Sequence, residues 1–226
     1  MSLATIDVSQ HILGKNEALA KELRDLYAKH GICVVNLLSG PGAGKTSTIL
    51  ATIEALKDSY HIAVIEGDIA SDVDAQKVKE HGAQAVQINT GGLCHLEGAM
   101  IKRATEILDL NQTDLIIIEN VGNLVCTVDF DLGESFKAMI LSVPEGHDKP
   151  LKYPGIFQAC NVILLNKIDT LPVFDFDTDA FYREIDDLNP NAQIFPISAT
   201  KHDGMDAWIM YLTQRIEEAR SVALSE

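Results

Sequence analysis

Residues 32–50 read ICVVNLLSGPGAGKTSTIL, and this stretch decides the fold of the chain. An apolar run stops at a glycine-rich turn, which is followed by Lys45-Thr46 and a helix-compatible segment. A strand, a glycine-rich loop and a helix N-terminus in this order are typical of a phosphate-binding loop, because backbone N–H groups and the helix dipole face the phosphate oxygens. Lys45 is expected to reach the β- and γ-phosphates, and the Thr46 hydroxyl to bind Mg²⁺.

The loop therefore predicts binding of a nucleoside triphosphate through Gly40, Gly42, Ala43, Gly44, Lys45, Thr46 and Ser47. The alternative, an ordinary glycine-proline turn between a strand and a helix, is disfavoured by the Lys-Thr pair that follows the turn. Ser39 departs from the pattern, since G-x-x-x-x-G-K-T has a glycine at that position. The turn that enters the loop is expected to differ slightly for this reason.

Length, charge and hydropathy narrow the class of protein. A chain of 226 residues accommodates one sizeable α/β domain. The formal net charge of −15 argues against nucleic acid or an anionic membrane as a partner, because both would repel an acidic protein. No apolar run approaches the ~20 residues that cross a bilayer, and residues 1–10 have no signal-peptide pattern, so we expect a cytoplasmic protein.

Strand-like runs alternate with helix-compatible stretches along the chain. Six apolar runs are predicted as strands, over residues 32–38, 61–66, 85–88, 115–119, 162–165 and 194–197. This alternation predicts a single α/β domain with a doubly wound, mostly parallel sheet of the P-loop NTPase type. Residues 1–30 are expected to form an N-terminal helix packing on the core, and residues 31–226 the GTP-binding domain. Residues 129–155, rich in proline and glycine, are expected to be an irregular functional loop.

Polar residues follow the predicted strands at their carboxyl ends, where doubly wound sheets bind ligands. Asp68 lies at the end of the second strand, which is expected to neighbour the first, and it is the predicted second Mg²⁺ ligand. Asp72 is the reserve candidate for this ligand; alternatively, it is the N-cap of the helix that follows. Glu119 is expected to hold a magnesium-bound water or to orient the attacking water, and Gly122 to let a backbone N–H approach the γ-phosphate. The predicted catalytic set is Lys45, Asp68, Glu119 and Gly122. Slow intrinsic turnover is expected, because no water-orienting glutamine is apparent.

The base is predicted from the motif NKID after the fifth strand. Asp169 can accept hydrogen bonds from N1–H and the exocyclic amino group of guanine, whereas adenine offers neither donor on that edge. Asn166 would brace the loops, and Lys167 would lie along the base. Ser198 and Ala199, after the last strand, complete the predicted subsite. The motif therefore favours GTP and GDP over adenine nucleotides.

Cys94 and His95 follow the third predicted strand, and Cys126 follows the fourth. If those strands end at the same edge of the sheet, the two loops are neighbours. Two thiolates and an imidazole form a suitable site for Ni²⁺ or Zn²⁺, with a fourth position open to water or a partner. Spacing alone leaves open a second interpretation, in which a buried thiol and a surface imidazole bind no metal.

Several motifs together resemble the hydrogenase nickel-incorporation GTPases (HypB), which belong to the dimerising SIMIBI class of P-loop GTPases. The motifs are GPGAGKT, NTGGLCHLEGAM, ENVGNLVCTVDFDLGE, NKID and KPLKYPGIF, and the resemblance spans nearly the whole chain. It implies GTP binding and hydrolysis, a homodimer that forms face to face when loaded with GTP, and delivery of Ni²⁺ to the large subunit of NiFe hydrogenase. It also implies that Cys94, His95 and Cys126 bind Ni²⁺ or Zn²⁺ at the dimer interface, with a second nickel accessory protein as a partner.

The N-terminal segment lacks one feature of some family members, and three alternative functions are compared with this interpretation. Residues 1–30 contain His11 and His30 but no cysteine, so the nickel-storage tract of some family members is not expected. A urease-type nickel-insertion GTPase is the nearest alternative, although its Cys-Pro-His motif is absent from the sequence. A small-molecule kinase is disfavoured by NKID and the Ser-Ala pair. A non-catalytic metal carrier that GTP only stabilises remains open.

Overall fold

A computed structural model describes the backbone of residues 8–68 and 73–224, and the side chains of residues 14–67 and 76–224. Within these residues seven strands form one sheet, and every neighbouring pair of strands is parallel. The strands are β1 (Cys33–Ser39), β2 (Ile62–Asp68), β3 (Gln84–Asn89), β4 (Leu115–Glu119), β5 (Phe136–Ser142), β6 (Val162–Asn166) and β7 (Gln193–Pro196). Their order across the sheet is β3-β2-β4-β1-β5-β6-β7.

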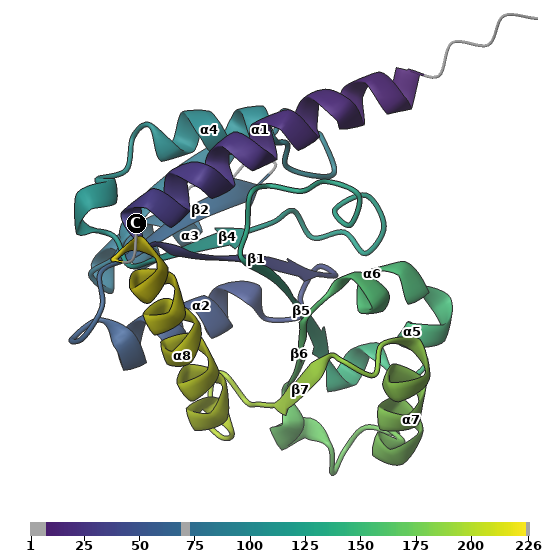
Figure 1. Cartoon of the computed structure of the whole chain (residues 1–226). Coiled ribbons are helices and arrows are strands. Elements are labelled where there is room, and N and C mark those ends of the chain that lie inside the picture. The colour runs from purple at the N-terminus through teal and green to yellow at the C-terminus, as the bar shows by residue number, and fades with distance from the viewer. Residues whose placement is uncertain (1–7, 69–72, 225–226) are drawn as a thin grey trace, which may run out of the picture.

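Helices cover both faces of this sheet (Figure 1). The α-helices are α1 (Val8–His30), α2 (Lys45–Leu56), α3 (Val73–Glu80), α4 (Gly98–Thr105), α5 (Lys149–Lys152), α6 (Pro154–Ala159), α7 (Thr178–Leu188) and α8 (Met205–Ala223). Three short 3₁₀ helices are η1 (Leu110–Gln112), η2 (Val143–Glu145) and η3 (Ile168–Thr170). None of the helices in the described ranges is long and apolar enough to cross a membrane.

Buried apolar side chains bind the helices to the two faces of the sheet. Trp208 of α8 packs with α2 and α3 on one face. On the other face, Leu23 of α1 and Ile101 of α4 cover the half with β2 and β4, while Phe157 of α6 and Phe181 of α7 cover the half with β5 and β6. The predicted α/β fold, a single domain with a doubly wound sheet, is confirmed, and the sheet is parallel throughout.

The strand β5 lies within residues 129–155, so the expectation of an irregular loop is wrong for the centre of that segment. Its sequence, FKAMILS, contains Lys137 and mixes Ala, Met and Leu, which favour helices, with a single β-branched residue. Tertiary context decides its structure, because β5 is hydrogen-bonded between β1 and β6 in the middle of the sheet. The fifth and sixth strands predicted from the sequence are therefore β6 and β7.

The strand order also corrects one expectation about the site. β2 is not the neighbour of β1, because β4 lies between them. Asp68, the last residue of β2, therefore lies two strands away from the strand that leads into the glycine-rich loop. Glu119, the last residue of β4, lies on the adjacent strand instead, with Leu37 of β1 as its register partner.

Candidate functional site

The glycine-rich loop joins the carboxyl end of β1 to the N-terminus of α2. Gly44, directly before α2, has a φ of 101°, a left-handed conformation that glycine adopts without strain. A Cβ atom at this position would also overlap the side chain of Asn166. Because α2 begins at Lys45, the N–H groups of its first turn and its positive dipole end face the loop. The loop can therefore receive an anionic phosphate group.

Ser39, the departure from the usual glycine pattern, has a definite place in the loop. It ends β1 and is fully buried. Its hydroxyl accepts a hydrogen bond from Lys45 Nζ at 2.8 Å and donates one to Gly40 O at 2.7 Å. A glycine at this position would offer no such acceptor. Ser39 therefore holds the lysine that is expected to reach the phosphates, and sequence reasoning did not assign it this role.

The end of β4 meets the glycine-rich loop. Glu119 is 9% exposed, and its Oε1 accepts a hydrogen bond from Thr46 Oγ1 at 3.2 Å. Gly122 packs against the loop so closely that a Cβ atom there would lie 3.3 Å from Pro41. The hydroxyl expected to bind Mg²⁺ and the carboxylate expected to position water are thus brought together. Hard oxygen donors beside a phosphate loop are the ligands that Mg²⁺ prefers.

These contacts do not include Asp68 and Asp72, the two predicted aspartate ligands of Mg²⁺. Asp68 ends β2, but its side chain and the whole of Asp72 lie outside the described residues. β2 and β4 end at the same edge of the sheet, with Glu66 paired in register to Glu119. The roles of Asp68 and Asp72 in binding Mg²⁺ stay predictions.

Asn166, the last residue of β6, joins three parts of the predicted base subsite. Its side chain is 2% exposed. Nδ2 donates to Ala43 O in the glycine-rich loop at 2.9 Å. Oδ1 accepts from Lys167 N at 2.8 Å and from Ala199 N at 3.2 Å. The phosphate loop and the two loops after β6 and β7 are therefore braced by one amide, as the sequence predicts for Asn166.

Asp169 and Lys167 are held in place beside this amide. Asp169 Oδ1 accepts a hydrogen bond from Ser198 Oγ at 2.6 Å, which orients the carboxylate expected to bind guanine. Lys167 has a φ of 61°, which is uncommon for a residue other than glycine, and its Nζ donates to Gly42 O at 2.7 Å. Such conformations persist where the surrounding structure enforces them, often at ligand sites. The predicted base and phosphate residues thus form one continuous region.

A cavity of about 450 Å³ opens beside the glycine-rich loop. It is lined by Gly40, Pro41, Gly122, Asn123, Leu124, Val125, Glu145, Lys149 and Tyr153. Glu145 was not singled out from the sequence. Its Oε2 accepts from the N–H and the hydroxyl of Ser142, both at 2.7 Å, and its Oε1 would lie 2.8 Å from a Cβ atom at Gly40. The Ser-x-x-Glu spacing, a capping-box signal, could have identified this carboxylate.

The loops after β3 and β4 bring the two predicted cysteine ligands together. The side chains of Cys94 and Cys126 lie close enough for Cys94 to shift the pKa of Cys126, and Cys94 Sγ lies 3.7 Å from His95 Nδ1. Asn123 shapes the turn at Cys126, because its Oδ1 accepts from Cys126 N at 2.9 Å. The neighbouring Cys94 thiol and, after it, desolvation raise the pKa of Cys126 above its ordinary value. This thiol therefore stays protonated at neutral pH until a metal displaces the proton.

His95 is held by its own neighbours. Its ring stacks on Phe130 with centroids 3.9 Å apart, and its Nε2 lies 3.4 Å from Glu97 Oε1. Among the side chains that the structure describes, no three His, Cys, Asp or Glu residues are placed to hold a metal ion. Cys94, His95 and Cys126 are thus gathered but do not form a ready-made coordination shell. Their predicted role as Ni²⁺ or Zn²⁺ ligands stays a prediction.

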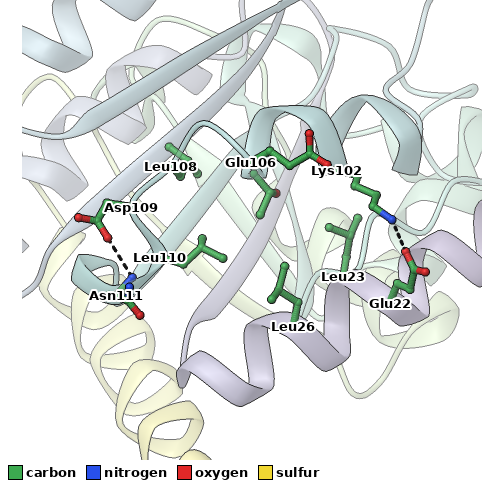
Figure 2. A pocket seen from close by; sticks show the side chains of 10 residues that line it. Glu22, Leu23, Leu26, Lys102, Glu106, Leu108, Asp109, Leu110 and Asn111 are labelled. Atoms are coloured by element: carbon green, nitrogen blue, oxygen red, sulfur yellow. Dashed lines mark hydrogen bonds and ion pairs between the residues drawn. The ribbon is translucent and has the colours of Figure 1, made fainter.

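A second cavity, of about 570 Å³, lies between α1 and the segment from α4 to η1 (Figure 2). Its apolar lining comes from four leucines, Leu23, Leu26, Leu108 and Leu110. An ion pair between Lys102 and Glu22, 2.5 Å long, lies at its rim. Since η1 precedes β4, this cavity lies toward the amino end of that strand, opposite the loops described above. Its described lining contains neither glycine nor cysteine, the residues that would suit a phosphate or a soft metal.

Comparisons with known proteins identify the family of the chain. Residues 33–196 match the family described as "CobW/HypB/UreG, nucleotide-binding domain". The hydrogenase maturation factor HypB of Escherichia coli K12 is 46% identical over 211 residues, which cover 93% of this chain and 73% of that protein. The hydrogenase/urease maturation factor HypB of Helicobacter pylori J99 is 37% identical over 222 residues, covering 96% of this chain and 91% of that protein.

A solved structure adds the fold to these sequence matches. The crystal structure of HypB from Helicobacter pylori in complex with nickel superposes with a TM-score of 0.85 at 38% identity, covering 90% of this chain and 96% of that one. Sequence identity and fold agree over almost the same length. The chain therefore belongs to the CobW/HypB/UreG family of nucleotide-binding proteins and, within it, to the HypB group.

Proposed function

We propose that this chain is a GTP-hydrolysing metallochaperone that delivers Ni²⁺ to the large subunit of NiFe hydrogenase during its maturation. The observation that carries the proposal is that the Cys94 and Cys126 side chains are neighbours, in loops that follow strands of the same sheet as the phosphate loop. Relatives named hydrogenase maturation factors, one of them solved with nickel, support the choice of metal and client.

The nucleotide would bind across the carboxyl edge of the sheet. The phosphates would lie in residues 40–47, and guanine would pair with the Asp169 carboxylate that Ser198 orients. The bracing amide of Asn166 would keep these two parts of the site in register. GTP and GDP would share these contacts, so the γ-phosphate alone distinguishes the two states.

Hydrolysis would depend on positioning and on neutralising charge. Thr46 and Asp68 would hold Mg²⁺, with Asp72 as the alternative ligand, and the ion would offset phosphate charge when bound. Glu119, hydrogen-bonded to the Thr46 hydroxyl, would orient the attacking water. Gly122, packed against the phosphate loop, would present a backbone N–H to the γ-phosphate, and Lys45 would neutralise it. Slow intrinsic turnover follows from the lack of a further water-orienting side chain in this set.

Nickel, the proposed cargo, would bind to Cys94, Cys126 and His95. Zn²⁺ would compete for the same ligands, because thiolate and imidazole suit both metals. Because metals bind thiolates, nickel binding would displace the proton that the raised pKa of Cys126 keeps on its thiol. A fourth position would remain for water or for a ligand from the receiving protein.

Exposed apolar side chains support the proposal of a nucleotide-dependent homodimer. Leu93 and Val125, each next to a cysteine of the proposed nickel site, are 41% and 60% exposed, and Leu151 is 66% exposed. Large apolar side chains exposed around a site are typical of interaction surfaces. A dimer would cover these residues and would enclose the metal site between the two protomers.

Other parts of the proposal concern the organisation and surroundings of the chain. We propose that residues 1–30 act as a helix packing on the GTP-binding domain of residues 31–226; α1 contributes Leu23 and Tyr27 to the core, which supports this division. We also propose that the protein works in the cytoplasm with the hydrogenase large subunit and a second nickel accessory protein. Its charge of −15 argues against nucleic acid or an anionic membrane as a partner.

Metal titration tests the proposal directly. Ni²⁺ and Zn²⁺ are titrated into the wild-type protein with GDP and with a non-hydrolysable GTP analogue, while the oligomeric state is recorded. Cys94→Ala and Cys126→Ala should each abolish tight nickel binding. Cys160→Ala is the matched control, because Cys160 is 2% exposed and packs in the core. Nickel binding that survives both substitutions would refute the proposed metal site.

Two alternatives have separate tests. Urease as the client is favoured by one observation, the name of the Helicobacter pylori relative as a hydrogenase/urease maturation factor. Nickel transfer to purified hydrogenase large subunit and to metal-free urease would distinguish the two clients. A non-catalytic carrier would show no difference between single-turnover assays with and without Mg²⁺.

A further inference from the structure

Asn120 is 1% exposed and directly follows Glu119, and the chemistry proposed above assigns it no role. Its Oδ1 accepts hydrogen bonds from two backbone N–H groups, Leu96 N at 3.3 Å and Val121 N at 2.9 Å. Its Nδ2 donates to Asn36 Oδ1 at 3.2 Å. A backbone N–H can only donate, so the side-chain atom that faces both must be the oxygen. The orientation of this amide is therefore determined by its surroundings.

The two N–H groups belong to different loops. Leu96 directly follows His95, in the loop that carries Cys94. Val121 directly precedes Gly122, which packs against the glycine-rich phosphate loop. Cys126 is tied to this second loop by the chain itself, whereas Cys94 and His95 are not. One oxygen atom of Asn120 therefore connects the segment expected to approach the γ-phosphate with the other half of the proposed nickel site.

Leu96 is held firmly on its other side as well. Its side chain is fully buried and fills the space above Gly67, where a Cβ atom would lie 2.8 Å from three of its carbon atoms. Gly67 directly precedes Asp68 at the end of β2. The backbone next to His95 is therefore clamped between the ends of β2 and β4. In a close-packed interior, a shift of either strand end must be transmitted to it.

The opposite side of Asn120 is anchored in the sheet. Asn36, in β1, is fully buried, and its Nδ2 donates to Glu134 Oε1 at 3.4 Å. Glu134 Oε2 accepts in turn from Leu132 N at 2.6 Å. This chain of buried polar groups holds Nδ2 in place, because each member is satisfied by the next. Oδ1 is thus the part of the amide that faces the two loops.

We propose that Asn120 is the positioning residue through which the bound nucleotide sets the geometry of Cys94 and His95. The proposal rests on the proposed function, to which it adds that nickel affinity depends on the bound nucleotide and that Asn120 links the two sites. When the segment at Gly122 moves to meet a γ-phosphate, Oδ1 either keeps or gives up its hydrogen bond with Leu96 N. The loop with Cys94 then has two arrangements, and nickel affinity differs between the GDP and GTP states through this bond.

The test compares nickel dissociation constants with GDP and with a non-hydrolysable GTP analogue. Asn120→Ala removes both bonds to the loops. Thr105→Val is the matched control, because it removes a buried hydrogen bond of 2.7 Å with Tyr27 at the last residue of α4, whereas the loop with Cys94 precedes the first. Thermal unfolding verifies that each variant is folded. Asn120→Ser, whose hydroxyl is too short to reach both amides, replaces Asn120→Ala if the latter does not fold.

We expect the ratio of the two nickel affinities to fall to within about twofold of one in Asn120→Ala, and to keep its wild-type value in Thr105→Val. By thermodynamic reciprocity, nickel should also lose its effect on the preference of Asn120→Ala for the analogue over GDP. A residue with only a structural role would lower the unfolding temperature but leave this ratio unchanged, and that result would overturn the proposal. If the ratio is one in the wild type, nickel affinity does not depend on the nucleotide, and the present proposal is overturned while the proposed nickel site stands. If Asn120→Ala keeps the ratio of nickel affinities found in the wild type, only the role of Asn120 is overturned.

Discussion

Substitution of Asn166 by alanine tests how the nucleotide site is held together. The side chain makes three hydrogen bonds, one donated to Ala43 O and two accepted from Lys167 N and Ala199 N. Asn166→Ala removes all three and leaves two backbone N–H groups in a buried environment. With a net contribution of about 1 kcal/mol for each bond, the free energy of unfolding should fall by about 3 kcal/mol. The loops expected to bind guanine and phosphate should also lose their common brace.

The assay combines urea denaturation with titration of GDP. The midpoint of unfolding should shift by about 1 M urea, given the slopes typical of domains of this size. GDP affinity should fall about tenfold or more, because one bracing bond is worth about that factor. Asn189→Ala is a matched control, since Nδ2 of Asn189 donates to three carbonyls, of Phe157, Gln158 and Cys160, and none of them belongs to the nucleotide site.

The two variants should therefore differ in one property only. Asn189→Ala should lose a comparable free energy of unfolding and bind GDP as the wild type does. If Asn166→Ala were to lose stability and still bind GDP with unchanged affinity, the bracing role would be wrong. A loss of stability below about 0.5 kcal/mol would contradict the value assigned to the three bonds.

Three further results are expected. Asp169→Asn should shift the preference from guanosine toward xanthosine triphosphate by roughly 10⁴. Ser198 Oγ would still donate to the side-chain oxygen of residue 169, so the new amino group would face the 2-carbonyl of xanthine. Competitive titration of the two nucleotides measures the ratio of affinities. Nickel affinity should rise with pH from 6 to 9, because the raised pKa of Cys126 keeps its thiol protonated across that range and each bound ion must displace this proton. Calorimetry in buffers of different ionisation enthalpy counts the protons released. Gly122→Ala should slow phosphate release more than it weakens GDP binding, since a methyl group there would lie 3.3 Å from the proline of the phosphate loop; unchanged turnover would count against the role of Gly122.

The fold could be predicted wherever a strand carries its own signal. The runs LIIIE and VILLN are apolar and β-branched, and the predicted bounds of 115–119 coincide with β4. β5 carries no such signal, because FKAMILS owes its conformation to hydrogen bonds with β1 and β6, which are distant in sequence. The order of the strands is equally non-local. For that reason the sequence placed Asp68 beside the first strand, where the structure has Glu119.

The candidate site also has a part that the sequence predicts and a part that it does not. Phosphate and base residues could be named from the sequence because each motif is a few consecutive residues with a chemical requirement at every position. The contacts that hold the motifs together join residues far apart in the chain, such as Asn166 with Ala43, or Asn120 with Leu96. A single sequence gives no indication of these pairs. The proximity of Cys94 and Cys126 could be predicted in part, because it follows only if the strands that precede their loops end at the same edge of the sheet.

The most direct test of the account follows nickel and phosphate in the same reaction. Protein loaded with Ni²⁺ receives GTP and Mg²⁺ in a single turnover, while a chromogenic chelator reports released nickel and a phosphate sensor reports hydrolysis. The account predicts that nickel leaves at the rate of phosphate release and stays bound with a non-hydrolysable analogue. Nickel release at the same rate with the analogue, or hydrolysis that leaves nickel in place, would contradict it.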